Sequence, residues 1–220
     1  MEARKKQYEY YRDNLFNIEN VEIKTLGEIG TLIRGNGLQK SDFRENGIGC
    51  IHYGQIYTYY RTYTDKTKSF VSGELAKGLK KVNCGDLVIA CTSENIEDVC
   101  KTVAWLGREE IVTGGHATIF KHAENPKYLA YYFQTREFFD QKKKYARGTK
   151  VIEISAKDLA KIKVPVPRKE IQNKIVQILD NFESLVNDIA FGLPAELNAR
   201  RQQYEYYRNK LLTFKEKPNE

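Results

Sequence analysis

The feature that most constrains this chain is an internal repeat. The segment Ala3–Leu15 recurs as Ala199–Leu211, with nine of thirteen positions identical at a constant offset of 196 residues. Chance does not produce such a match, so two copies of one element flank the region between them. The copies are too far apart for a solenoid. They indicate a modular unit in which one element precedes a domain and the same element follows it.

Length and composition set the outer limits. With 220 residues, 41% of them hydrophobic, the chain can form one medium globular domain and a helical appendage. The sequence contains no run of about 18 apolar residues, the length that a transmembrane helix needs. Its first residues are charged and aromatic, whereas a signal peptide needs an apolar stretch there. We therefore expect a cytoplasmic protein without a membrane partner.

The four cysteines do not form a metal-binding pattern. They lie in apolar or strand-like surroundings, and their spacing does not match that of zinc ligands in any combination: Cys50, Cys84, Cys91 and Cys100. We expect reduced, mostly buried thiols and no metal on this chain.

The positive charge is concentrated in one stretch. The net charge is +7, and the pI is close to 9.0. Residues 141–163 contain eight Lys or Arg against two Asp or Glu, so this stretch alone carries +6. Such a run is either a solvated face or a surface for an anionic partner such as nucleic acid.

Long helices are predicted after the two prolines of Pro165–Pro167, which mark a domain boundary. Apolar residues alternate at steps of four and three, the a/d spacing of a coiled coil, at Ile171, Ile175, Ile178, Phe182, Leu185 and Ile189. A helix over 168–192 would be about 37 Å long, close to one turn of DNA. An amphipathic helix packed on its own domain fits the same periodicity. A glycine and a proline at 192–194 then indicate a kink or a hairpin, before heptad spacing continues at Leu197, Tyr204 and Leu211.

The middle region, 17–167, mixes strand and helix signals. Short strands bounded by Gly, Asn and Asp are predicted over 21–25, 31–34, 50–57, 87–91, 99–106, 117–120 and 161–166. Asn125-Pro126 predicts the start of a helix, whose aromatic face continues until Arg147-Gly148 ends it. The predicted fold class is α+β, with one mixed domain of about 150 residues and long coiled-coil-forming helices.

Motifs for catalysis are missing from the sequence. Glu124–Tyr128 lacks the second proline of a methyltransferase strand end, and Gly30–Gly37 lacks the lysine and hydroxyl of a P-loop. The three histidines, His52, His116 and His122, have no Cys or Ser partner at a recognisable spacing. We therefore expect a non-catalytic chain.

If the anionic partner of the basic stretch is DNA, contact needs cations that neutralise phosphate, and planar or amide groups that reach base edges. The phosphate candidates lie at a basic helix end and in the Gly loop that follows: Lys142, Lys143, Lys144, Arg147 and Lys150. The base-reading candidates lie in turns or at strand ends: Arg34, Asn36, Lys40, Tyr53, Gln55, Tyr59, Arg61, Ser93 and His116. The cluster Tyr57–Tyr63 is equally compatible with an amphipathic strand that has tyrosines on one face.

Several motifs along the chain combine into one pattern. Lys163–Pro167 leads directly into Glu170–Asp180, and Gly192–Glu196 leads into Gln203–Arg208. Upstream stand Leu26–Gly30, Gly85–Ile89, and Gly148-Thr149 followed by Ile154-Ser155 and Leu159. Together these segments resemble the landmarks of the specificity subunits of type I restriction-modification enzymes, and the resemblance covers essentially the whole chain.

The resemblance implies three regions and a function. Residues 1–16 are a conserved helical element, residues 17–167 a DNA-binding target recognition domain, and residues 168–220 a conserved helical region for spacing, dimerisation and methyltransferase docking. The chain is expected to bind double-stranded DNA and to direct methylation (M) and restriction (R) subunits. It binds no cofactor itself, because S-adenosylmethionine, ATP and Mg belong to the partners.

The resemblance also bears on assembly. The usual subunit of the family has two recognition domains, whereas this chain has one. We expect a homodimer whose contact is the heptad series from Ile171 to Ile189. A chain that works alone, or one half of a larger subunit that joins a different recognition domain, fits the single domain as well.

Two other classes remain compatible with the residues alone. One is a non-catalytic protein-interaction module with a dimerising coiled coil, whose basic patch binds an acidic partner. The other is a nuclease or RNA-binding protein. Salt-dependent binding to duplex DNA separates the first from a DNA-binding subunit, and metal-dependent cleavage by the chain alone would support the second.

Overall fold

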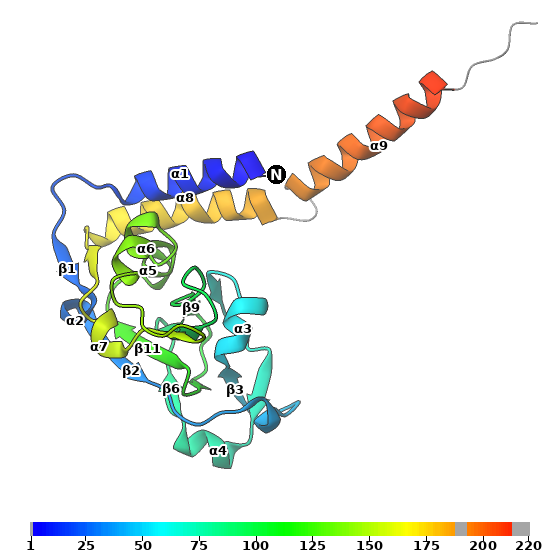
Figure 1. The fold of residues 1–220 in the computed structure, drawn as a ribbon. Helices are drawn as coiled ribbons and strands as arrows, with labels where there is room; N and C mark the ends of the chain where they lie inside the picture. The colour runs from blue at the N-terminus through cyan, green and yellow to red at the C-terminus, as the bar shows by residue number, and fades with distance from the viewer. Residues whose placement is uncertain (1, 188–192, 213–220) are drawn as a thin grey trace, which may run out of the picture. The chain divides into compact units, whose positions relative to one another are not determined.

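A computed structural model describes residues 2–187 and 193–212 of the chain (Figure 1). These residues divide into two compact units. The globular unit is Tyr10–Val176, and the helical unit contains the described residues of 1–9 and 177–220. The globular unit therefore includes residues 10–16 and 168–176 in addition to the recognition domain predicted over 17–167.

Two sheets form the framework of the globular unit. The five-stranded sheet has the order β2-β11-β7-β9-β4, with strands Gly30–Arg34, Ala117–His122, Leu87–Ala90, Thr102–Trp105 and Tyr63–Thr64. The four-stranded sheet has the order β5-β3-β10-β6, with strands Ser69–Val71, Ile48–Ile51, Ile111–Thr113 and Lys80–Val82. Neighbours are antiparallel except for the parallel pairs β4–β9 and β3–β10.

Two short antiparallel ladders complete the strands. β1 (Ile23–Thr25) pairs with β13 (Lys163–Pro165), which brings the two ends of the middle region 17–167 together. β8 (Thr92–Ser93) pairs with β12 (Ile152–Glu153). The mixture of sheets with separate helices confirms the predicted α+β class.

The core has two layers, one on each face of β7. All four residues of β7 are fully buried, as expected for a central strand that is apolar throughout. Val88 belongs to a cluster between the two sheets that also includes Ile51, Val103, Ile111 and Ile119. On another side of the five-stranded sheet lie the fully buried rings of Tyr128, Tyr131, Tyr132 and Phe138.

Side-chain caps fix where the short helices begin. The helices are α2 (Leu26–Ile29), η1 (Lys40–Asp42), α3 (Tyr53–Thr58), α4 (Gly73–Gly78), α5 (Pro126–Tyr132), α6 (Arg136–Lys142) and α7 (Ala156–Leu159). Asn125 Oδ1 accepts hydrogen bonds from the backbone N–H groups of Lys127 and Tyr128, so the predicted helix start is confirmed. Ser72, Thr135 and Ser155 cap α4, α6 and α7 in the same way.

Two predicted elements are wrong in extent. The strand over 50–57 ends at Ile51, because His52 caps a helix and α3 begins at Tyr53. The single helix from Pro126 to Arg147 is two helices, because Thr135 breaks the first and caps α6. The Tyr57–Tyr63 cluster is not a strand either, since α3 continues to Thr58 and β4 starts only at Tyr63.

Three long helices include the two copies of the repeat: α1 (Glu2–Phe16), α8 (Lys169–Asn187) and α9 (Leu193–Leu212). α1 and α8 run in opposite directions beside each other, and the rings of Tyr8 and Phe182 are 6.3 Å apart (Figure 1). In the globular unit, Phe16 packs against Tyr128 at 5.0 Å. The aromatic residues of α1 therefore contact α8 at Tyr8 and α5 at Phe16.

The base of α8 is anchored by a buried amide. Gln172 is fully buried, its Nε2 donates to Glu124 Oε2 and to the carbonyl of Pro167, and its Oε1 accepts from the N–H of Asn125. Burial costs little for a polar group whose hydrogen bonds are all made. The amide therefore fixes the first turn of α8 on the globular unit.

The predicted heptad series is divided between two environments. Ile175 is only 5% exposed and Phe182 contacts Tyr8, whereas Ile171, Ile178 and Leu185 are 40%, 40% and 60% exposed. Ile189 lies outside the described residues, as do residues 188–192 of the predicted 37 Å helix and the proposed kink or hairpin glycine. The described α8 has 19 residues, or about 28 Å. A coiled coil is not shown within the described chain.

Three further observations concern cysteines, metal ligands and membrane spans. Cys50, Cys91 and Cys100 are buried free thiols, and Cys84 is an exposed one. No group of three or more His, Cys, Asp or Glu that could hold a metal ion occurs in residues 2–187 and 193–212. Within the same residues, no helix is both long enough and apolar enough to cross a membrane.

Candidate functional site

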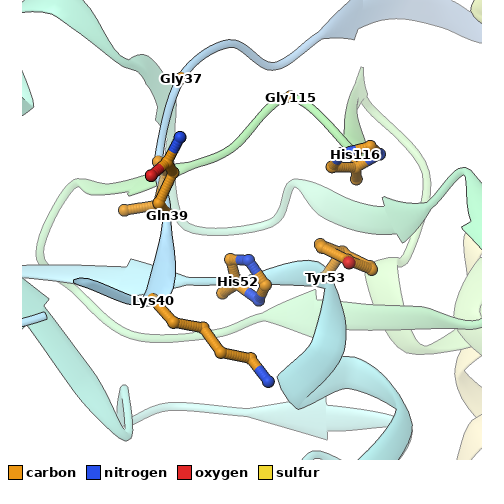
Figure 2. Close-up of a pocket in the computed structure, with 8 residues that line it drawn as sticks. Gly37, Gln39, Lys40, His52, Tyr53, Gly115 and His116 are labelled. Atoms are coloured by element: carbon orange, nitrogen blue, oxygen red, sulfur yellow. The ribbon is translucent and has the colours of Figure 1, made fainter. Parts of the chain in front are cut away.

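A hollow of about 490 Å³ opens on the surface of the globular unit. The residues that line it are Gly37, Leu38, Gln39, Lys40, His52, Tyr53, Gly115 and His116 (Figure 2). They come from the loop after β2, the start of α3 and the turn between β10 and β11. Three predicted base-reading residues, Lys40, Tyr53 and His116, therefore meet in one place, which we call the recognition pocket.

An unusual backbone shapes the loop on one side of the recognition pocket. Gly37 and Leu38 both have positive φ angles, 55° and 59°. A leucine in this region costs about 1–3 kcal/mol. The side chain of Leu38 is only 6% exposed and packs with Val71 and Leu79, and this burial offsets the cost. The buried Leu38 side chain therefore holds the loop in place, and Gln39 and Lys40 remain exposed beside the hollow.

Aromatic rings line the floor of the recognition pocket. The ring centroids of His52 and Tyr53 are 4.5 Å apart, and those of Tyr53 and His116 are 4.8 Å apart. Phe43 packs edge-on against His52 at 5.7 Å. Each ring of this row contacts its neighbour, so the packing restricts where the polar atoms at the ring edges can lie.

The two imidazoles differ in their surroundings. His52 is buried, and burial, followed by the charges of Lys40 and His116, lowers its pKa, so it is neutral at neutral pH. Its Nδ1 accepts a hydrogen bond from the Gly54 N–H at 3.2 Å, which assigns the proton of the neutral ring to Nε2. His116 is exposed, and its Nδ1 lies 3.1 Å from Thr92 Oγ1.

Two further base-reading candidates stand next to the recognition pocket in fixed positions. Arg34 Nε donates to the carbonyl oxygen of Gly115 at 2.9 Å, and its Nη1 forms an ion pair with Glu153. Asn36 Nδ2 donates to the carbonyl oxygen of Gly78 at 2.8 Å. Both residues are exposed, so their remaining donors face solvent.

Other candidates lie outside the pocket lining. Ser93 is half-buried on β8. Tyr59 and Arg61 are exposed in the segment between α3 and β4, where the Lys68 ammonium lies 4.5 Å from the centre of the Tyr59 ring. The structure does not bring these residues into the hollow.

Two predicted contacts are structural, and this corrects the prediction. Gln55 is 9% exposed; its Oε1 accepts from the His52 N–H and its Nε2 donates to Ser69 Oγ. Lys142 is 4% exposed, and its Nζ donates to the carbonyl oxygens of Glu97 at 2.8 Å and Val99 at 2.5 Å. Burial lowers the pKa of Lys142. Neither side chain is on the surface.

The other predicted phosphate contacts are exposed. Lys143, Lys144, Arg147 and Lys150, which we call the basic loop, follow α6 and turn at Gly148, whose φ is 100°. Arg147 pairs across this turn with Glu153 through the backbone, and its guanidinium is 80% exposed at 3.8 Å from Asp158. The loop therefore presents cations to solvent.

A chain of contacts joins the basic loop to the recognition pocket. Glu153 is hydrogen-bonded to Arg147 through the backbone and lies opposite Thr92 in the β12–β8 ladder. Thr92 in turn contacts His116, and Glu153 forms the ion pair with Arg34. These contacts thus link the basic loop to the recognition pocket and to Arg34 beside it.

Sequence reasoning missed three residues of the recognition pocket as contact or positioning residues: Leu38, Gln39 and His52. His52 was considered only as a catalytic group. The adjacent Gly35-Asn36-Gly37 run indicated a turn, but a leucine with positive φ has no local signal. It depends on an interior site formed by α4 and β5, which lie more than thirty residues further along the chain.

Comparisons with known proteins agree with one another. A family profile described as "Type I restriction modification DNA specificity domain" matches residues 18–199. The chain is 33% identical to the type I restriction enzyme EcoR124I/EcoR124II specificity subunit of Escherichia coli, over 97% of this chain and 54% of that protein. It is 28% identical to the putative type I restriction enzyme specificity subunit S.HindORF215P of Haemophilus influenzae, over 96% and 53%.

The chain therefore spans about half the length of these curated relatives. A solved structure described as the basis of complex assembly and conformational transition of the type I R-M system contains a chain with a similar fold. The TM-score is 0.61, over 96% of this chain and 50% of that chain, at 18% identity. At this identity the likeness shows the fold alone.

Proposed function

This chain belongs to the family of type I restriction-modification DNA specificity domains, and on that premise we propose that it binds duplex DNA and selects the sequence at which partner subunits act. One observation carries the proposal: within the globular unit, contacts through Arg34, Thr92 and Glu153 link the basic loop to the recognition pocket. Cations hold the phosphate backbone, and the adjacent side chains discriminate bases.

We infer that the chain contributes recognition and no chemical step. In this proposal the methylation subunits hold S-adenosylmethionine, and the restriction subunits use ATP and Mg. The sequence supports this division of labour, because it lacks the second proline of a methyltransferase motif and the P-loop lysine. The histidine geometry supports it as well, because His52 is neutral, buried and engaged by Gly54. Such a complex works where the DNA is, in the cytoplasm.

The repeat supports a homodimer as the working assembly. In α1, Tyr8 packs against Phe182 of α8. The matching residue of the second copy, Tyr204 in α9, is 66% exposed, and Ile178 and Leu185 of α8 are also exposed. A second chain supplies an equivalent α8 surface for the exposed copy, and our proposal assigns it that role. Two chains related by a two-fold axis present identical recognition domains in inverted orientation, so the target is a palindrome split by an unread spacer.

Charge reversal in the basic loop tests the DNA-binding function. Lys143→Glu, Lys144→Glu and Arg147→Glu, combined, should weaken binding to all duplex sequences similarly, because phosphate contacts carry no sequence information. A plot of log affinity against log salt concentration should become less steep in the variant. The slope should decrease in magnitude by about 0.9 for each phosphate contact that the variant loses. Unchanged affinity at low salt would show that the loop is a solvated face, and binding only to an acidic protein would favour an interaction module.

Mapping of methylated adenines tests the complete proposal. In cells where this chain is the only specificity subunit, together with its methylation subunits, we expect modification at inverted, identical half-sites. Unlike half-sites would refute the homodimer. Methyl transfer or metal-dependent cleavage by the purified chain alone would refute the non-catalytic role.

A further inference from the structure

The recognition pocket is rich in hydrogen-bond donors of fixed polarity. Lys40 Nζ has three donors and no acceptor, and it forms no ion pair with any residue in the part of the chain that the structure describes. His52 is a second donor, because its Nδ1 already accepts from Gly54 and its proton is on Nε2. These two groups call for acceptors on a ligand, whereas the exposed Gln39 amide can donate or accept.

The backbone around the recognition pocket takes little part in recognition, since its polar groups are already paired. The carbonyl oxygen of Gly37 accepts from the N–H of Gly115, and the carbonyl oxygen of Gly115 accepts from Arg34 Nε. The N–H of Gln39 donates to Asp42 Oδ2. The exposed side chains of the lining, Gln39, Lys40 and His116, are left to contact a ligand. Figure 2 shows Lys40 and His116 on opposite sides of His52 and Tyr53.

The charge of the recognition pocket favours a base over a phosphate. The basic loop offers four exposed cations to the phosphate backbone. The pocket lining contains one lysine, the amide of Gln39, a neutral His52 and rings that contact one another at a tilt. Of the four bases, guanine presents two adjacent acceptors, O6 and N7, in the major groove, whereas adenine presents N7 beside a donor. Lysine paired with these two atoms is among the commonest specific contacts.

We propose that the recognition pocket reads a guanine of the target through its O6 and N7 atoms, with Lys40 as the main donor. This inference rests on the DNA-binding function proposed above and names the base that one part of that surface selects. Leu38 is a positioning residue for the contact: its buried side chain holds the left-handed turn that directs Gln39 and Lys40 to the rim.

A selection from a random duplex library tests the proposal. The full chain, alone and with its methylation subunits, is compared with Lys40→Met and with Lys143→Met, a matched loss of one lysine charge in the basic loop. We expect the unaltered chain to select a sequence with a guanine whose preference falls by about 5- to 150-fold in Lys40→Met, while other positions keep theirs. Lys143→Met should weaken all sequences alike.

Modified bases in the selected duplex then identify the contacted atoms. Replacing the guanine by 7-deazaguanine removes N7 and should weaken binding by the unaltered chain but not by Lys40→Met. Inosine keeps O6 and N7 and loses only the minor-groove amino group, so binding should persist. An unchanged preference in Lys40→Met overturns the inference, and so does a uniform loss, which would make Lys40 a phosphate contact. In both cases DNA binding stands. A lack of any sequence preference in the unaltered chain overturns the proposed function itself.

Discussion

Lys142 and Lys143 are neighbours with opposite environments, and this pair allows a sharp test of the structure. Lys142 is 4% exposed, with Nζ donating to the carbonyl oxygens of Glu97 and Val99, whereas Lys143 is exposed in the basic loop. Lys142→Met keeps most of the side-chain volume but removes both hydrogen bonds. Lys143→Met removes the same charge from the surface.

The expected loss of stability follows from the hydrogen bonds of Lys142. A hydrogen bond to a charged group contributes about 1.5–3 kcal/mol, and the substitution removes two of them. The change also removes the cost of burying an ammonium group, which offsets part of the loss. We expect Lys142→Met to lower the free energy of unfolding by about 2–4 kcal/mol. The urea midpoint should fall by about 1 M.

Two assays separate the two lysines. Urea unfolding followed by circular dichroism should show the loss for Lys142→Met and almost none for Lys143→Met. The salt dependence of duplex binding should show the reverse, with the slope reduced by about 0.9 only in Lys143→Met. If Lys142→Met is as stable as the unaltered chain and has the reduced slope, Lys142 contacts phosphate and its structural role is refuted.

Three further predictions concern pH, assembly and the base of α8. Burial lowers the pKa of His122 from 6.5 to about 4. As the pH falls, the unfolded chain binds a proton on this ring before the folded chain does, so the free energy of unfolding is undiminished above pH 6.5 and falls by about 3 kcal/mol between pH 6.5 and 4. Urea unfolding at a series of pH values measures this loss, which should be absent in His122→Gln. Ile178→Asp combined with Leu185→Asp should abolish the homodimer in analytical ultracentrifugation and, in cells, site-specific methylation with it, because both side chains are exposed on α8; a persisting dimer would locate the interface elsewhere. Gln172→Leu leaves the Asn125 N–H and the Pro167 carbonyl oxygen without their partner, while Glu124 keeps its ion pair with Lys169. The substitution should lower the unfolding free energy by about 2–3 kcal/mol; an unchanged urea midpoint would contradict the anchoring role.

Much of the fold was predictable because its signals are local. The cap at Asn125, the buried run of β7 and the strand that ends at Pro165 each depend on a few consecutive residues. The predicted extents were wrong at His52 and Thr135, because at each position one capping side chain begins a new helix within a continuous run of apolar residues. Periodicity does not reveal such breaks, since the aromatic pattern continues across them.

The candidate site was predictable only in part. Residue type identified Lys40, Tyr53 and His116, but nothing in their spacing shows that they share one hollow, because they come from three separate segments. The heptad series was correct as a pattern of apolar residues. Which of its members are buried, as Ile175 is, and which remain exposed, as Ile178 does, depends on what packs against each turn of α8.

The sequence by itself determined the duplicated element, the α+β class, the location of the excess positive charge and the family. These properties are carried by residue identity and order along the chain. The tertiary structure decided which lysine of the basic stretch is buried, which heptad residues remain exposed, and that Leu38 pins a loop against the His52–Tyr53–His116 row. Burial is a property of contacts between distant residues: Lys142 bonds Val99 from 43 positions away, and Arg34 meets Glu153 from 119. Only the folded chain brings such partners together.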